Sequence, residues 1–272
     1  MSVLDVVALQ LSAELGDVTG NVERLLDAVR THGPGSDLVV TPELITTGYD
    51  LDMLDERGAE LAEPLDGPTV SAVAKAAAEV GTTIVLGLLE RDGDVLYDTA
   101  AVILPDGAVH PFRKTHLYPA ELTRFTAGQG LLTVDTPAGR LGPLICFEHA
   151  FPELATTLAL AGTQTLVIPS AVPIGYEYLL TLRTRARAQD NQMFAVACNL
   201  TGGGFTGHSL IVDPAGNVLA SAGAEETALR ARLNLDLIAK ERHQEPALGM
   251  RQVDLYRPEA VDRLGVVTAG DQ

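Results

Sequence analysis

The chain contains no tryptophan and only two cysteines, and its six phenylalanines and six tyrosines make up 4% of it. Two cysteines cannot build the disulfide framework of a small secreted domain. Both of them, Cys146 and Cys198, lie in apolar segments. The cysteine content therefore favours free thiols in a reducing compartment.

Basic residues are also scarce, with 19 Lys and Arg against 36 Asp and Glu and a formal net charge of -17. Binding to nucleic acid requires clustered Lys and Arg that neutralise phosphates, and here the basic residues are scattered. We therefore expect no nucleic-acid partner. The acidity itself is typical of a well-solvated protein surface and says little about a substrate.

Long apolar runs are missing too, since no run approaches the roughly 18 residues of a membrane-spanning helix. The first residues, MSVLDVVALQL, lack a basic segment, and Asp5 interrupts their apolar run. They resemble a first β-strand more than a signal peptide. We expect a protein that has no membrane partner and acts in the cytoplasm.

What the chain does have is enough apolar sequence for a large core, because 46% of its 272 residues are hydrophobic. No Pro/Ser-rich linker, charge block or change of composition divides it. We therefore predict a single domain over residues 1–262 and a C-terminal tail over residues 263–272.

Short β-branched and aliphatic runs alternate with segments of helical period, which predicts an α/β protein. Turn sequences at 92–93, 105–107 and 214–216 predict hairpins, so antiparallel pairs should accompany parallel ones in mixed sheets. Strands are expected at 4–11, 38–41, 83–89, 99–104, 144–147, 166–169, 193–199, 209–212, 218–222 and 228–235. Helices are expected at 22–31, 70–80, 153–161 and 178–191.

Cys146 occupies a position that suits a nucleophile. The apolar run Leu144 to Phe147 is expected to be a strand that leads directly into a helical segment. A thiol at such an elbow is held rigidly, and nearby helix amides favour the thiolate. An inert core cysteine is the alternative, and for Cys198 it is the better interpretation.

An acid and a cation follow two other strand-like runs. Glu43 ends the run DLVVTPE, where partial burial would let it take a proton from a thiol. Lys114 follows AVHPFR and offers a fixed positive charge for an oxyanion. Taken alone, Glu43 is better explained as a capping or salt-bridged carboxylate and Lys114 as an exposed residue of an edge strand, so these patterns leave the chemistry open.

Together the three segments resemble the carbon-nitrogen hydrolase (nitrilase) superfamily, in its amidase-like branch. The motifs stand here as PELITTGY with Glu43, RKTHLYPAE with Lys114 and GPLICFEHAFPE with Cys146, in the family's order. Further similarity lies at RARAQDNQMFAVACNLTG and GHSLIVDPAGNVLA, so that the resemblance covers nearly the whole chain.

The resemblance implies a four-layer α-β-β-α sandwich with two mixed β-sheets and pairing into a homodimer or a larger homo-oligomer. It implies hydrolysis of a small amide through a thioester, without metal or organic cofactor. Glu43 would be the base, Cys146 the nucleophile, and Lys114 with the N–H of Phe147 would hold the oxyanion. Glu121 matches a second glutamate, which supports the lysine and the substrate amide.

Departures from the family pattern bear on the substrate. The run CFE fits neither the CYD of many amidases nor the CWE of typical nitrilases. A small aliphatic or amino-acid-derived amide is the first expectation, and a nitrile or an N-carbamoyl amine or amino acid is the alternative. His149 and Ala150 stand where members that act on dicarboxylate monoamides often carry arginine, which argues against such substrates. A binding protein that has lost the use of its triad is a further hypothesis.

Residues that follow the expected strand ends are candidates for the substrate pocket. The six histidines show no metal-ligand spacing, so we expect no metal site. The expected pocket residues are Tyr49, Phe147, Ser170, Ala171, Val172 and Pro173.

Overall fold

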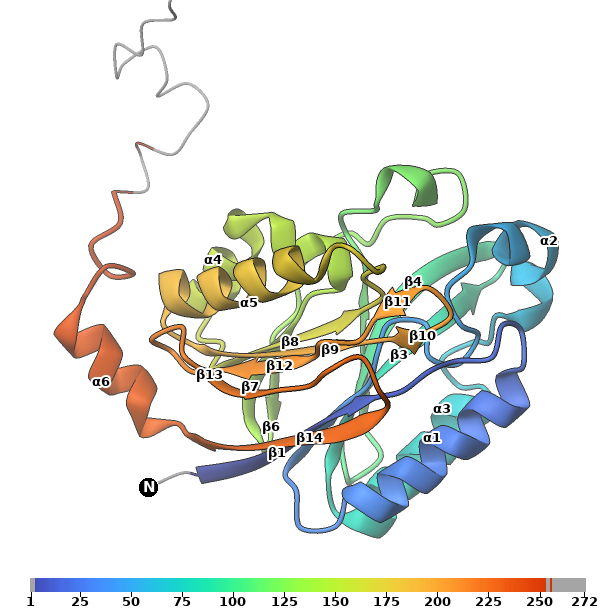
Figure 1. The fold of residues 1–272 in the computed structure, drawn as a ribbon, viewed down its shortest axis with the longest axis horizontal. Coiled ribbons are helices and arrows are strands. Elements are labelled where there is room, and N and C mark those ends of the chain that lie inside the picture. The colour runs from blue at the N-terminus through green and yellow to red at the C-terminus, as the bar shows by residue number, and fades with distance from the viewer. Residues whose placement is uncertain (1–2, 253–254, 256–272) are drawn as a thin grey trace, which may run out of the picture.

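The structure is a computed structural model that describes residues 3–252 and Leu255. Two six-stranded sheets pack face to face, with helices on the outer side of each (Figure 1). This is the expected four-layer α-β-β-α sandwich with two mixed sheets. The predicted tail over residues 263–272 lies outside the described residues, and the domain boundary stays a prediction.

The first sheet has the strand order β14-β1-β2-β3-β4-β5. Strands β1, β2 and β3 are parallel to one another, whereas β14, β4 and β5 each join by antiparallel pairing. Because β5 is antiparallel to β4, and β4 is antiparallel to β3, β5 runs in the same direction as β2 and β3. The C-terminal ends of these three strands therefore lie at the same edge of the sheet. The bounds are β1 (Val3–Gln10), β2 (Leu38–Val40), β3 (Thr83–Asp92), β4 (Val95–Ile103), β5 (Val109–Arg113) and β14 (Thr227–Asn234).

The second sheet has the order β13-β12-β9-β8-β7-β6, with β7, β8 and β9 parallel. A small hairpin is formed by β10 and β11, which have two residues each. The bounds are β6 (Val134–Thr136), β7 (Gly139–Pro143), β8 (Thr165–Ser170), β9 (Phe194–Asn199), β10 (Thr201–Gly202), β11 (Phe205–Thr206), β12 (Leu210–Val212) and β13 (Val218–Ser221). The three predicted hairpins join β3 to β4, β4 to β5 and β12 to β13.

Helices α1 and α3 cover the first sheet, and α4 and α5 cover the second (Figure 1). Among the described residues, no helix is long and apolar enough to cross a bilayer. The bounds are α1 (Val18–His32), α2 (Leu51–Leu61), α3 (Pro68–Val80), α4 (Pro152–Leu160), α5 (Glu177–Asn191) and α6 (Asp236–Gln244), with the 3-10 helices η1 (Pro119–Glu121) and η2 (Cys146–Ala150). The predicted helices match α1, α3, α4 and α5, while α2 and α6 were not predicted.

Strand β1 shows why both faces of these sheets are apolar. Successive side chains of a strand point to opposite faces. Val6 and Ala8 belong to the core between the two sheets, whereas Val7 and Leu9 pack in the cluster that contains Leu25 of α1. Both faces are therefore covered, as the lack of hydrophobic alternation indicates.

One predicted strand is wrong. The second sheet uses Gly139–Pro143 as β7, and Leu144 to Phe147 leaves the sheet and turns into η2. The apolar run LICF has strand-like composition, but Cys146 adopts a backbone φ of +44°, which no strand allows. The sharp turn thus falls at the cysteine itself.

Candidate functional site

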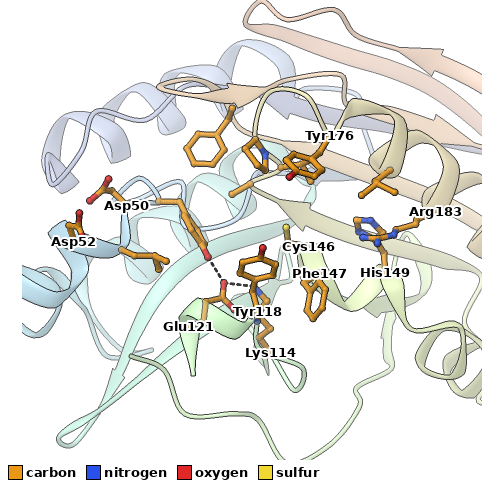
Figure 2. Close-up of a pocket in the computed structure, with 17 residues that line it drawn as sticks. Asp50, Asp52, Lys114, Tyr118, Glu121, Cys146, Phe147, His149, Tyr176 and Arg183 are labelled. Carbon is orange, nitrogen blue, oxygen red and sulfur yellow. Dashed lines mark hydrogen bonds and ion pairs between the residues drawn. The ribbon is translucent and has the colours of Figure 1, made fainter. Parts of the chain in front are cut away.

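The residues of the three motifs meet where strands of both sheets end. Glu43 follows β2, Lys114 follows β5 and Cys146 follows β7. These strand ends face a cavity of about 560 Å³ whose lining includes Lys114, Glu121 and Cys146. Segments far apart in sequence thus surround one thiol (Figure 2).

Lys114 is the centre of a buried cluster of charges. Its side chain is 1% exposed, and Nζ donates to Glu43 Oε1 at 2.6 Å, to Glu121 Oε1 at 2.8 Å and to Asp98 Oδ2 at 3.0 Å. Burial alone would lower the pKa of Lys114, but the carboxylates of Glu43, Asp98 and Glu121 outweigh it and hold that pKa well above its usual range. Lys114 therefore stays a fixed cation.

In the described part of the chain, the carboxylates of Glu43, Asp98 and Glu121 lie close enough together that they could hold a metal ion. Each of them already contacts the Lys114 ammonium. The lysine thus supplies the positive charge at this position.

Asp98, on β4, was not predicted as part of the site. Burial, the largest influence, raises the pKa of Asp98 well above its usual range, and Glu43 raises it further against the opposing effect of Lys114. Asp98 Oδ1 and Glu43 Oε2 are both buried and have no other hydrogen-bond partner among the described residues. A proton on Asp98 that pointed to Glu43 would satisfy both oxygens and would remove one of three crowded negative charges.

This assignment predicts different effects for two substitutions of Asp98. Asp98→Asn keeps a neutral group of the same shape and should leave the melting temperature within about 2 °C. Asp98→Ala leaves the Lys114 ammonium without one buried partner and should cost about 1 to 3 kcal/mol of unfolding free energy. Thermal and denaturant unfolding of both variants measure the difference, and equal destabilisation by Asn and Ala would show that Asp98 is ionised.

The thiol of Cys146 is partly exposed to the cavity. Burial raises the pKa of Cys146 well above its usual range, and Glu43 raises it further, while Lys114 and the backbone amide of Ala171 lower it. A nearby amide does favour the thiolate, as expected, but burial has the larger effect. The resting group is a neutral thiol, so it needs a base.

Glu148 is a second residue of the site that the sequence analysis missed, although it is the glutamate of the CFE run. Its carboxylate is fully buried and accepts hydrogen bonds from Thr115 N at 2.8 Å, Thr115 Oγ1 at 2.6 Å and Ile145 N at 2.8 Å. It thereby ties the loop after Lys114 to the turn that carries Cys146.

Backbone packing fixes Glu43 as well. A Cβ atom on Gly87 of β3 would lie 2.1 Å from Pro42 O and 2.9 Å from Glu43 Cα. The close approach of these two segments therefore requires glycine at position 87. On the other side, the Glu43 amide donates to Ser170 O at 3.4 Å.

Glu121 is held by two further groups besides Lys114. Tyr49 donates its hydroxyl to Glu121 Oε1 at 2.5 Å, and the Tyr118 amide donates to Oε2 at 2.7 Å. Figure 2 marks the contact between Lys114 and Glu121 with a dashed line. Burial, with the negative charges of Glu43 and Glu121, raises the pKa of Tyr49, so that it remains a donor.

Most of the expected pocket residues line the cavity. Tyr49, Phe147, Ala171, Val172 and Pro173 do so. Ser170 was expected in the pocket but is not part of the cavity lining. Its side chain is fully buried, and its Oγ donates to Ile168 O at 3.1 Å. As the last residue of β8 it supports the Glu43 backbone.

Comparison with known proteins identifies the family. Residues 6–242 match the family model described as carbon-nitrogen hydrolase. The chain belongs to this family. As a carbon-nitrogen hydrolase it is an enzyme, and its relatives include amidases.

Two relatives and one solved structure illustrate the similarity. An (R)-stereoselective amidase from a Pseudomonas species is 33% identical over 252 residues, which are 91% of each chain. An omega-amidase from Mus musculus is 32% identical, with 94% of this chain and 97% of the relative covered. An amidase from Nesterenkonia sp. AN1, solved as a mutant with the acetamide moiety of fluoroacetamide added covalently at its active-site cysteine, has a TM-score of 0.82 at 26% identity over 93% of this chain and 95% of that one.

Proposed function

We propose that this carbon-nitrogen hydrolase converts a small aliphatic or amino-acid-derived amide and water into a carboxylic acid and ammonia. The observation that carries the proposal is the position of Cys146, on a sharp turn in the cavity, within electrostatic reach of Glu43, Lys114 and Glu121. A thiol, a carboxylate base and a fixed cation are the groups that amide hydrolysis through a thioester requires.

In the first half-reaction, Glu43 takes the proton of the Cys146 thiol, and the sulfur attacks the amide carbon. The oxyanion that forms accepts a hydrogen bond from the N–H of Phe147, and the positive charge of the Lys114 ammonium stabilises it further. Phe147 is suited to this role because it lies in the first turn of η2, where N–H groups have no partner within the helix. The proton on Glu43 passes to the nitrogen, the C–N bond breaks, and ammonia leaves.

In the second half-reaction, Glu43 removes a proton from water, and the hydroxide attacks the thioester carbon. The C–S bond breaks, the sulfur regains the proton from Glu43, and the carboxylic acid is released. Glu121 keeps Lys114 in place through the 2.8 Å contact. The scheme needs no cofactor, because proton transfer and the two displacements use only these side chains.

We further propose that the enzyme forms a homodimer or a larger homo-oligomer. Leu160 of α4 and Tyr178 and Leu182 of α5 are 57%, 62% and 61% exposed, which leaves apolar side chains uncovered on the outer helical layer. Sedimentation of the purified protein measures the assembly. The free thiols of Cys146 and Cys198 agree with action in the reducing cytoplasm.

The function is tested with matched panels of amides, nitriles and N-carbamoyl compounds. Mass spectrometry of the products distinguishes a carbamoyl substrate, which yields an amine, from an amide or a nitrile, which both yield an acid. Amide and nitrile hydrolysis are then told apart by which of the two panels is converted. We expect the highest kcat/KM on an amide, with a mass increase of one acyl group on Cys146 at early times. Nitriles or carbamoyl compounds as the best substrates would replace this proposal by the corresponding alternative. No turnover on any panel, with no adduct on Cys146, would favour a binding protein.

A further inference from the structure

The cavity is electrically asymmetric about the thiol. Figure 2 shows Asp50 and Asp52 on one side of Cys146, and His149 and Arg183 together on the other. Asp50 belongs to the start of α2, where its side chain accepts from Met53 N. The basic side is built from η2, which carries His149, and α5, which carries Arg183.

Arg183 is a cation that has no acidic partner among the residues that the structure describes. It lines the cavity, and no hydrogen bond or ion pair joins its guanidinium to another residue of the described chain. One turn further along α5, Arg187 pairs with Asp190 at 3.4 Å. In a protein with 36 acidic and 19 basic residues, an arginine that faces a cavity unpaired is available to an anion from outside.

His149 adds a second unsatisfied group at the same place. It lines the cavity at 1% exposure, and neither ring nitrogen meets a hydrogen-bond partner of good geometry among the described residues. Burial, followed by the charge of Arg183, lowers the pKa of His149 to about 3, against the opposing effect of a poorly aligned contact with the Cys146 backbone. The imidazole is therefore neutral at neutral pH and keeps one N–H that can donate. Buried polar groups normally have partners, so a missing one points to a ligand.

We propose that Arg183 and His149 form an anion subsite, and that the preferred substrate is an amide whose acyl chain ends in a carboxylate. The guanidinium would bind that carboxylate through two parallel hydrogen bonds while Cys146 attacks the amide carbon at the other end. This inference rests on the proposed amidase function. The proposal also reverses the expectation that dicarboxylate monoamides are poor substrates. That expectation was based on the lack of an arginine at positions 149 and 150, whereas Arg183 of α5 lines the cavity instead.

Matched substrates test the subsite. Succinamate, glutaramate and adipamate carry the carboxylate, and butanamide, pentanamide and hexanamide are the neutral amides of equal chain length. The kcat/KM of each is measured by ammonia release for the wild type, Arg183→Gln, Arg183→Lys and the control Arg185→Gln. Arg185 is on the same helix, is exposed, and donates to Gly216 O away from the cavity.

We expect the wild type to prefer the carboxylate at one chain length by at least about tenfold. Arg183→Gln should lower this preference about 10- to 100-fold, mainly through KM, because one charge-assisted interaction is lost. Arg183→Lys should retain part of the preference, and Arg185→Gln should retain all of it. An equal fall for charged and neutral amides, or a change of oligomeric state in Arg183→Gln, would overturn the proposal by assigning Arg183 a structural or interface role.

A binding measurement separates failure of the subsite from failure of the proposed function. Succinate, glutarate and adipate should raise the melting temperature of the wild type and not that of Arg183→Gln, whether or not any amide is hydrolysed. If neutral amides are good substrates and no dicarboxylate binds, the subsite is wrong and the amidase function stands. If a dicarboxylate binds through Arg183 and no amide is hydrolysed, the subsite stands and the amidase function is wrong.

Discussion

Cys146→Ala is expected to lower kcat/KM on the best amide by at least about 10⁴-fold, because no other group in the cavity can form the covalent acyl intermediate. Cys146→Ser should lose nearly as much. The raised pKa of the Cys146 thiol already makes proton removal demanding, and a serine hydroxyl holds its proton far more tightly. Steady-state kinetics give the loss, and intact-protein mass spectrometry should find the acyl adduct on the wild type alone.

Cys198 provides the matched control for this experiment. It is fully buried in β9, its Sγ lies 3.3 Å from Leu9 O, and burial raises the pKa of its thiol. Cys198→Ala should therefore reduce stability by about 1 to 3 kcal/mol while kcat/KM changes little. A Cys146→Ala protein that keeps its melting temperature and still hydrolyses the amide would refute the thioester route.

The predictions from sequence match the structure best for residues and elements that a short local sequence pattern marks. Glu43 and Lys114 each follow a strand-like run, Cys146 lies in an apolar run, and strand ends gather reactive groups at one edge of a sheet. The predicted helices also match, because their apolar residues recur with the helical period. Fold class and cluster thus follow from short-range patterns together with the family resemblance.

The remaining features depend on contacts that no local pattern encodes. Asp98 lies inside β4 between Tyr97 and Thr99, and only its 3.0 Å contact with Lys114 reveals its role. Glu148 is buried because four donor groups from two loops surround its carboxylate. The turn at Cys146 requires a positive φ at a residue whose type does not favour it, which tertiary packing must impose. Charged residues in strands and strained turns are therefore where sequence reasoning failed.

Glu43→Gln is the second substitution with a large expected effect. It preserves the shape of the side chain but removes the base that both half-reactions need, so kcat/KM at neutral pH should fall by about 10²- to 10⁴-fold. Loss of the Glu43 charge also removes one of the influences that raise the pKa of the Cys146 thiol. Free thiolate then becomes easier to form as the pH rises.

The pH dependence of kcat/KM distinguishes a role of Glu43 as the base from a structural role. In Glu43→Gln the rate should increase about tenfold per pH unit from neutral pH upward, until the thiol has ionised, because hydroxide then replaces the missing base. The wild type should lack this slope, since Glu43 removes the proton from a neutral thiol. Glu121→Gln is the control: it weakens the support of Lys114 and lowers kcat, but it keeps the wild-type pH profile. A Glu43→Gln enzyme whose profile parallels that of the wild type would show that another group takes the proton from Cys146.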